Sequence, residues 1–398
     1  MRPVIGSRAL LIATLVVPAL AHADQRQALG GGSELVFTGQ QAHQRGRLEV
    51  RKGKLRVRLV EALKLTKIVV DAEHRKVDVD VEAYWCDASA PEHHAWTFAQ
   101  LDAKLENTAA FALHGKKDYQ AAALGFARAA AADPSWRIPA YNLASAQTLL
   151  GHPDAAIQAL SPWLTSEPIA TYVQVTRDPE LSPLLGRPEL AAIRAARPGA
   201  VKLGVTGLEG EVAYAPARGL LAVTRTEQSW AACAFQTALE LHDAATGTLV
   251  ATTPVVTWSE TSPDCDKTSG GIAARARGAV AQRAARLQAM LVELGFVTAT
   301  VERGAAIESV PAKGPYPKQK AVFPQRKIGL VAADRTARVL AGNTELATGK
   351  VLDTIRAAVF VADTSTLIVW SLHPSGEACG ASDPTLVTVL PIKPARSP

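Results

Sequence analysis

LDAKLENTAAFALHGKKDYQAAALGFARAAAADP (residues 101–134) is followed directly by SWRIPAYNLASAQTLLGHPDAAIQALSPWLTSEP (residues 135–168), and the two segments repeat each other with a period of 34 residues. Small or landmark residues coincide at this shift: Ala110 with Ala144, Ala122 with Ala156, Phe126 with Leu160 and Pro134 with Pro168. The polar turns Lys117-Asp118-Tyr119 and Gly151-His152-Pro153 coincide as well. Because proline cannot continue a helix, each copy is predicted to end its second helix at its last residues.

This pattern resembles the tetratricopeptide repeat (TPR) family, whose period is 34 residues with a tight turn inside each repeat. The resemblance covers residues 103–196, including a degenerate tail from Asp178 to Ile193. The family has an aromatic residue early in the first helix, where this chain has Glu106 and Ala140. The resemblance implies stacked helical hairpins with a groove lined by the first helix of each copy.

The family's spacing implies eight groove positions: Lys104, Asn107, Phe111, His114, Ile138, Tyr141, Ser145 and Thr148. These positions lack the Lys, Arg and Asn cluster that holds a peptide's terminal carboxylate in some members. The resemblance therefore implies a protein or peptide partner but does not indicate which class of ligand the groove binds. The alternative is that the helices are purely structural and join two β-rich parts, because two full repeats make only a shallow groove.

The N-terminus predicts export. Arg2 and Arg8 flank a short positive region, an apolar run follows from Ala9 to Leu20, and Ala21-His22-Ala23 supplies the small-x-small pattern of a cleavage site. The apolar run is shorter than the roughly 20 residues that span a bilayer. We expect residues 1–23 to be a signal peptide, no transmembrane segment after cleavage, and a periplasmic or extracellular protein.

Four cysteines follow the expected cleavage site: Cys86, Cys233, Cys265 and Cys379. An even number in an oxidising compartment favours disulfide bonds, and no pair has the Cys-x-x-Cys spacing of a redox or zinc site. Three connectivities are possible. We favour Cys233–Cys265 and Cys86–Cys379. The formal charge of +6 is scattered among matched acids, so a nucleic-acid partner is not expected.

Residues 34–85 alternate apolar and polar side chains with the period of strands. Asp78, Asp80 and Glu82 suggest a cation site, but the glycine-bearing loop of an EF-hand is absent. The simpler interpretation is an acidic strand paired with the basic strand of Arg56 and Arg58.

Strand-like runs return after residue 201, with one helix predicted over about 272–294. Its arginines, Arg275, Arg283 and Arg286, are expected to form a solvated face. A second, weaker repeat has an offset of 146: Leu221-Ala222-Val223 falls on Leu367-Ile368-Val369, and Cys233 on Cys379. Chance similarity between two hairpins explains it equally well.

No catalytic constellation is evident. The nearest nucleophile is Cys379, with His373 and Asp383 close in sequence, and the nearest metal-like cluster is His93-His94 with Cys86 and Glu92. Adjacent histidines point apart on regular structure, so no metal is predicted. The Gly30-Gly31-Gly32 run lacks the features of a phosphate loop, and no cofactor is expected.

The predicted fold class is α+β multidomain: a short TPR-like α-hairpin module lies between a β-rich N-terminal segment and a disulfide-tied α+β C-terminal region. The expected domains are a signal peptide (1–23), the N-terminal segment (24–95), the helical repeats (96–197) and the C-terminal domain (198–398). The predicted function is an exported protein-interaction or scaffold module without catalysis. The alternative is an envelope or secreted hydrolase whose site lies in the C-terminal region.

Overall fold

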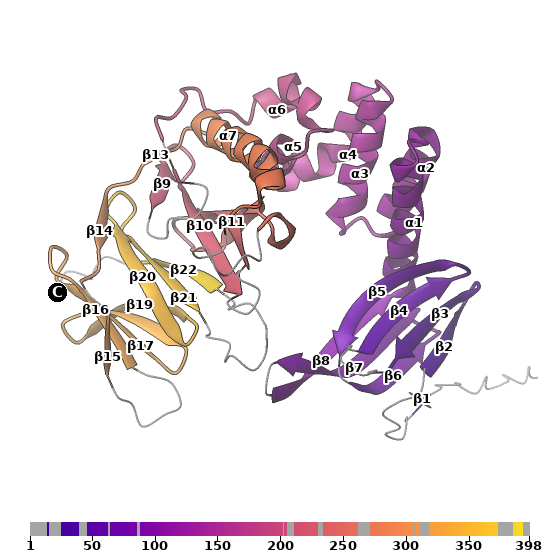
Figure 1. Ribbon diagram of the computed structural model, residues 1–398, viewed down its shortest axis with the longest axis horizontal. Helices are drawn as coiled ribbons and strands as arrows, with labels where there is room; N and C mark the ends of the chain where they lie inside the picture. Colours follow the sequence, from indigo (N-terminus) through magenta and orange to yellow (C-terminus); the bar gives the residue numbers. More distant parts are fainter. Residues whose placement is uncertain are drawn as a thin grey trace, which may run out of the picture. The chain divides into compact units, whose positions relative to one another are not determined.

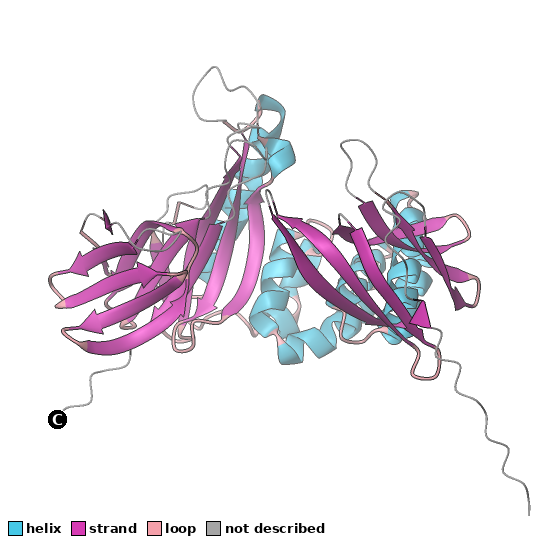
Figure 2. Cartoon of the chain, turned by 90° about the horizontal axis from the view of Figure 1, so that it is seen from below, coloured by secondary structure: helices cyan, strands magenta, loops and turns pink. Residues whose placement is uncertain are grey.

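The computed structural model describes residues 14–15, 25–39, 46–62, 64–85, 88–201, 203–204, 211–229, 234–261, 271–305, 307–310, 318–372 and 385–392. The chain divides into two units, Met1–Leu160 and Ser161–Pro398, and the boundary falls inside one helix. Figure 1 labels the elements of both units, and Figure 2 separates helices from strands by colour. In the part of the chain that is described, no helix is both long and apolar enough to cross a membrane.

The first unit has two antiparallel sheets. One is the meander β2-β3-β4-β5 (Gln25–Gly30, Ser33–Thr38, Gly46–Lys52 and Leu55–Ala62). The other has the order β1-β6-β7-β8 (Thr14–Leu15, Lys64–Asp71, Lys76–Trp85 and Ala88–Thr97). The alternating apolar side chains of these strands, including Leu35, Leu48, Val77 and Val79, share one buried core.

Helix α1 (Phe98–Gly115) completes this core. It begins at a capping box, in which the Thr97 hydroxyl accepts from the Gln100 N–H while the Gln100 side chain accepts from the Thr97 N–H. Phe98, Leu101 and Leu105 on its first half pack into the same cluster as the strands. The first half of α1 therefore belongs to the hydrophobic core of the two sheets.

Helices α2 (Tyr119–Ala132), α3 (Arg137–Leu149) and α4 (Pro153–Ser166) follow. A small cluster centred on Phe126 and including Ala110, Ala122 and Ala146 holds α1, α2 and α3 together. The backbones of α1 and α2 come so close that a Cβ at Gly125 would lie 2.7 Å from the Ala110 Cβ. Alanine and glycine at these crossing points let the helices pack.

The second unit begins with α5 (Pro168–Arg177), a 3-10 turn (Ser182–Gly186) and α6 (Pro188–Ala191). Its first sheet has the order β12-β11-β10-β9-β13 (Leu249–Val256, Ala234–Asp243, Leu220–Ser229, Val212–Ala215 and Val297–Thr298). Helix α7 (Arg277–Glu293) follows short 3-10 turns at Trp258–Glu260 and Ala274–Ala276. It lies within the predicted range, and with α5 it packs against β12.

Two more antiparallel sheets complete this unit. One has the order β14-β20-β21-β22 (Val301–Arg303, Thr354–Val361, Thr366–Leu372 and Thr385–Pro391). The other is the meander β15 to β19 (Glu308–Val310, Lys318–Phe323, Ile328–Ala333, Thr336–Ala341 and Thr344–Lys350). The sheet containing β21 contributes to hydrophobic clusters with each of the other two, so it is the middle of three layers.

The weaker repeat falls on equivalent strands. Leu221-Ala222-Val223 lies on β10 and Leu367-Ile368-Val369 on β21, each directly after a hairpin turn. The turns match in conformation, because Gly219 and Ser365 have φ of 63° and 53°. Trp370 Nε1 donates to the Thr224 carbonyl at 2.8 Å, which joins the two copies at the offset of the repeat.

The predicted fold class is wrong. The described chain is β-rich, with five antiparallel sheets, and its helices do not form a separate TPR-like hairpin module. Helix α1 belongs to the core of the first two sheets, whereas α5 and α7 pack on a sheet of the second unit. The C-terminal region is built from stacked sheets with shared hydrophobic cores. The cysteines predicted to tie it, Cys233, Cys265 and Cys379, lie outside the described residues, as does Cys86.

The predicted pairing of the acidic and basic strands is also wrong. Asp78, Asp80 and Glu82 lie on β7, which pairs with β6 and β8. Arg56 and Arg58 lie on β5 of the other sheet, opposite Arg51 and Glu49 on β4. The alternation identified both strands, but it carries no information about which strands are neighbours.

Candidate functional site

Helices α1 and α3 lie side by side (Figure 1). Side-chain contacts join them at several points. Asn142 Nδ2 donates to Asn107 Oδ1 at 2.9 Å. Near the start of both helices, Lys104 Nζ lies 4.7 Å from the centroid of the Trp136 ring. Further along both helices, Ser145 Oγ lies 3.4 Å from His114 Nε2. The two helices therefore run in the same direction, and we call their shared surface the α1–α3 face.

The eight residues predicted for a groove lie on α1 and α3 at very different depths, and the structure links Lys104, Asn107 and His114 of α1 to the α3 side. Phe111 and Ile138 are exposed, at 61% and 42% of their full surface. Lys104, Asn107, His114 and Thr148 are half-buried, whereas Tyr141 and Ser145 are buried. The Thr148 hydroxyl donates to the Ala144 carbonyl, so it serves the helix itself. Phe111 and Ile138 are the predicted residues that a partner would touch most.

Phe111 lies at the exposed edge of an aromatic cluster. Its ring stacks on His114 at 6.2 Å between centroids, with an angle of 11° between the planes. His114 in turn meets the edge of Tyr119 at 5.1 Å and lies 6.2 Å from Phe126, which is fully buried. An exposed aromatic side chain is of the kind that contributes most at binding interfaces.

Two residues of this face, Trp136 and Asn142, were not predicted from the sequence. Trp136 is the N-cap of α3 and carries the ring beneath Lys104. Asn142 forms the link to α1. The family's spacing gives positions on the first helix of each copy, one turn apart, and Trp136 precedes that helix. Its position just after the helix-ending Pro134 was the available signal.

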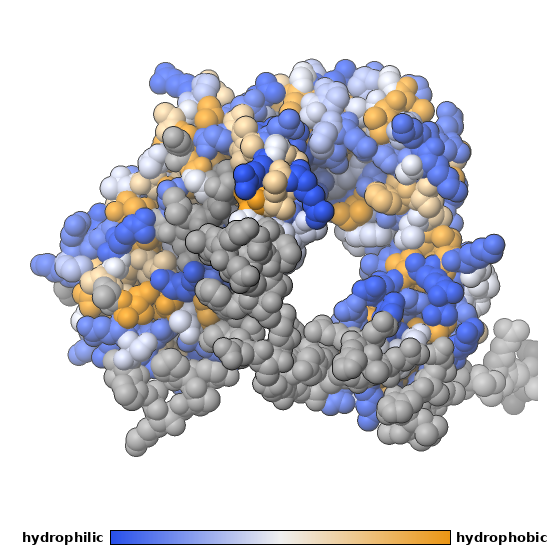
Figure 3. Space-filling model, viewed as in Figure 1, coloured by the Kyte–Doolittle hydropathy of each residue, from blue (hydrophilic) through white to orange (hydrophobic). Residues whose placement is uncertain are grey.

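A second surface lies on the other helices of the same unit. A groove of about 310 Å³ is bordered by α2, α3 and α4, and its lining includes Leu124, Leu143 and Leu150 with the polar side chains Gln120, Gln147, His152 and Gln158. Leu124 is 60% exposed, close to the value for Phe111. On the face that Figure 3 shows, apolar residues are interspersed with polar ones. With its exposed Leu124, this groove is the rival of the α1–α3 face.

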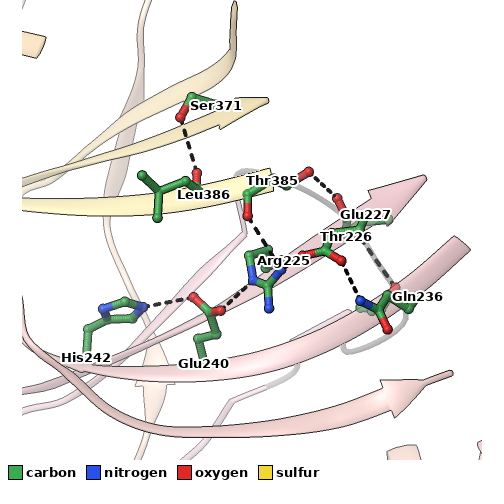
Figure 4. A network of polar contacts seen from close by, with 10 residues as sticks. Arg225, Thr226, Glu227, Gln236, Glu240, His242, Ser371, Thr385 and Leu386 are labelled. Carbon is green, nitrogen blue, oxygen red and sulfur yellow. Dashed lines mark hydrogen bonds and ion pairs between the residues drawn. The ribbon is translucent and has the colours of Figure 1, made fainter. Parts of the chain in front are cut away.

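The second unit contains a polar network between β10, β11 and β22 (Figure 4). Arg225 contacts Glu227, donates to Glu240 Oε1 at 2.6 Å and lies near the Thr385 carbonyl. His242 Nε2 lies 3.1 Å from Glu240 Oε2, and Gln236 donates to Glu227. Thr385 Oγ1 donates to the Thr226 carbonyl at 2.8 Å.

Burial and mutual pairing make this network structural. Glu240 and His242 are almost fully buried, and Arg225 pairs with the carboxylates of both Glu227 and Glu240. Burial raises the pKa of Glu240, but hydrogen bonds from His242 and Arg225 outweigh that effect and hold the pKa below its ordinary value. Such a pair costs much to break because the remaining charge would be buried alone. The network therefore ties two sheets together and presents no reactive group.

The prediction of a solvated arginine face on α7 is wrong for Arg283. Its guanidinium makes two hydrogen bonds to Glu260, at 2.8 and 2.9 Å, and one to the Val255 carbonyl at 2.7 Å. The hydrogen bond from Arg283 lowers the pKa of Glu260 to about 2, from an ordinary value of 4.5. Arg275 on the preceding turn is exposed, as predicted for the whole set.

This pair predicts a pH-dependent part of the stability. Because the folded pKa of Glu260 lies below its unfolded value, its contribution is present above about pH 4.5 and is lost as the pH falls toward 2. We expect Arg283→Leu to reduce the urea midpoint at pH 6 and to flatten its fall between pH 5 and pH 2.5. Arg275→Leu is the matched control and should retain the wild-type pH profile. Equal pH profiles for Arg283→Leu and the wild type would contradict the account.

The histidines next to Cys86 do not act together. His93 Nδ1 lies 2.7 Å from Asp80 Oδ1 on the outer face of the sheet. His94 points the other way and stacks on Trp96, with 5.6 Å between ring centroids. Among the described residues, no group of three or more His, Cys, Asp and Glu side chains is arranged to hold a metal ion. His373, Cys379 and Asp383, the residues of the hydrolase alternative, lie outside the described residues.

Comparisons with protein-family models, curated proteins and solved structures found no match to this chain. The resemblance of residues 103–196 to the tetratricopeptide family is not tested by these comparisons and stays a prediction. Function is therefore inferred from the surfaces of the described residues, among which the α1–α3 face carries the exposed apolar side chains of Phe111 and Ile138.

Proposed function

We propose that the protein is exported and acts as a binding or scaffold protein that holds a protein or peptide partner on the α1–α3 face. The observation that carries this proposal is the pair of exposed apolar side chains, Phe111 and Ile138, on a frame already fixed by hydrogen bonds between the two helices. The basis for export is the N-terminal pattern from Arg2 to Ala23.

The side chains of the α1–α3 face indicate which chemical groups the partner would need. Phe111 is an aromatic anchor of the kind that dominates binding energy at interfaces. Lys104 adds a positive charge next to the aromatic ring of Trp136. An apolar side chain flanked by acidic residues complements both features, so the partner we propose is an acidic segment with an apolar anchor.

Photo-crosslinking tests the proposal. A benzophenone amino acid is placed in turn at positions 111 and 138, at position 124 in the rival groove, and at position 249 on β12. Leu249 is 48% exposed and belongs to the second unit, so it reports non-specific capture. We expect positions 111 and 138 to trap the same partner from an extract of the exported compartment, and position 249 to trap none.

Two outcomes would contradict the proposal. Trapping from position 124 alone would move the binding surface to the groove between α2, α3 and α4. Equal trapping from all four positions, or none from 111 and 138, would show that the α1–α3 face holds no specific partner.

A further inference from the structure

One end of the first unit's sandwich has a small open cavity, and Lys52, Arg75, Gly30 and Gly31 in its lining are exposed. The turns β2–β3, at Gly31–Gly32, and β6–β7, at Ala72–Arg75, come together there with the C-terminal end of β4 and the start of α1. The cavity has a volume of about 200 Å³, and its lining includes Leu29, Gly30, Gly31, Ser33, Lys52, Arg75, Phe98, Leu101 and Asp102. Pockets for drug-sized ligands occupy roughly 300–1,000 Å³, so this one suits a smaller molecule.

The cavity combines apolar and charged walls. Phe98 and Leu101 are buried and, with Leu29, give an apolar side. Lys52, Arg75 and Asp102 bring charges of both signs to the same space. Neither Lys52 nor Asp102 forms an ion pair or side-chain hydrogen bond with any other residue that the structure describes, so both charged groups are free to meet a ligand.

Arg75 is held at the cavity by α1. Its backbone lies in the left-handed region, with φ of 51°, which is uncommon for a residue with a side chain. Its carbonyl accepts the Phe98 N–H at 2.9 Å, and its guanidinium lies 5.2 Å from the centroid of the Phe98 ring. The hydrogen bond and the ring contact link both ends of the residue to α1. The Arg75 side chain is exposed, and its guanidinium lies over the Phe98 ring beside the cavity.

The opposite wall is main chain. Gly30 and Gly31 have φ of 89° and 60°, and a Cβ at either position would meet nothing within 4 Å. The space beside them is open. A small ligand can therefore enter past the turn without displacing a side chain.

We propose that this cavity binds a free α-amino acid with an apolar side chain. The carboxylate would lie at Lys52 and Arg75, the ammonium group at Asp102, and the side chain against Leu29, Phe98 and Leu101. A simple anion would meet the Asp102 carboxylate, and a simple cation would meet Lys52 and Arg75. A zwitterion satisfies both signs, and its apolar side chain covers the remaining wall. The site is separate from the α1–α3 face.

Calorimetric titration of the full chain with L-leucine tests the proposal, with N-acetyl-leucine, which lacks the ammonium group, and leucinamide, which lacks the carboxylate, as matched probes. We expect L-leucine to bind with a Kd between about 1 µM and 1 mM. Each analogue should bind at least about 10-fold more weakly, because it leaves one charged group without its partner.

Variants separate the roles of the two charges. Asp102→Asn should weaken L-leucine binding about 10-fold or more while leaving the weak binding of N-acetyl-leucine unchanged. Lys52→Met should weaken L-leucine and leave leucinamide unchanged. Lys54→Met is the matched control, because Lys54 is exposed on the next turn and does not line the cavity. Circular dichroism confirms that each variant is folded.

Three outcomes would overturn the inference: no heat with L-leucine at about 10 mM, equal binding of L-leucine and N-acetyl-leucine, or binding of inorganic phosphate without binding of L-leucine. The last outcome would show an anion site. Loss of partner binding by Phe111 variants has no bearing on these results, so failure of this inference and failure of the proposed function are distinguishable.

Discussion

Replacing Trp370 with alanine is expected to destabilise the second unit by about 3–5 kcal/mol, which is a large part of the stability of an ordinary domain. Trp370 is fully buried on β21, in the hydrophobic cluster shared by the middle sheet and the sheet of β10. Its removal leaves a cavity in that layer and takes away the Nε1–H that the Thr224 carbonyl accepts at 2.8 Å. Chemical denaturation followed by circular dichroism measures the loss.

Two further variants separate packing from hydrogen bonding. Trp370→Phe keeps most of the apolar volume and loses the donor, so we expect a smaller cost of about 1–3 kcal/mol. Leu249→Ala, at a side chain that is 48% exposed, should cost less than about 1 kcal/mol. A cost below 1 kcal/mol for Trp370→Ala would show that the two sheets are not held together through this residue.

The sequence predicted many strands and helices but not how they assemble. Alternation in β5 and β7 and the apolar spacing of α7 are local signals, and each element lies where its pattern placed it. Which strands pair depends on contacts between residues far apart in the sequence. The acidic strand β7 and the basic strand β5 were therefore paired wrongly, although both were found.

The 34-residue period led to the wrong prediction that the helices form a separate module. Alanine-rich helices repeat visibly because small residues recur at each crossing, as Ala110, Ala122 and Ala146 do around Phe126. Strands that are buried on both faces, such as β21 with Thr366 to Ser371 all buried, show no alternation at all. Strand-like runs were predicted on both sides of the helices, but such patterns do not show how many sheets the strands form or how the sheets stack.

The candidate site was predictable in part. The family's spacing placed Lys104, Asn107, Phe111 and His114 on one side of α1, and all four take part in contacts at the α1–α3 face. The same spacing gave no information on depth, and Tyr141 is buried beneath the surface. The cavity at Lys52, Arg75 and Asp102 joins elements distant in sequence, so no motif could indicate it.

Phe111→Ala is expected to weaken partner binding by about 2–4 kcal/mol, or roughly 30- to 900-fold in Kd. Phe111 offers the largest exposed apolar side chain of the α1–α3 face, and the His114 ring beneath it links it to buried Phe126. The truncation removes an exposed anchor without opening the core, so the fold should be unaffected.

The measurement that tests the central claim most directly is the Kd of the crosslinked partner for Phe111→Ala and for Leu124→Ala, side by side. Leu124 is as exposed as Phe111, at 60% against 61%, and lies in the rival groove. If the α1–α3 face binds the partner, Phe111→Ala raises the Kd at least about 30-fold and Leu124→Ala changes it less than about 3-fold. An unchanged Kd for Phe111→Ala would contradict the claim, whatever the result for Leu124→Ala.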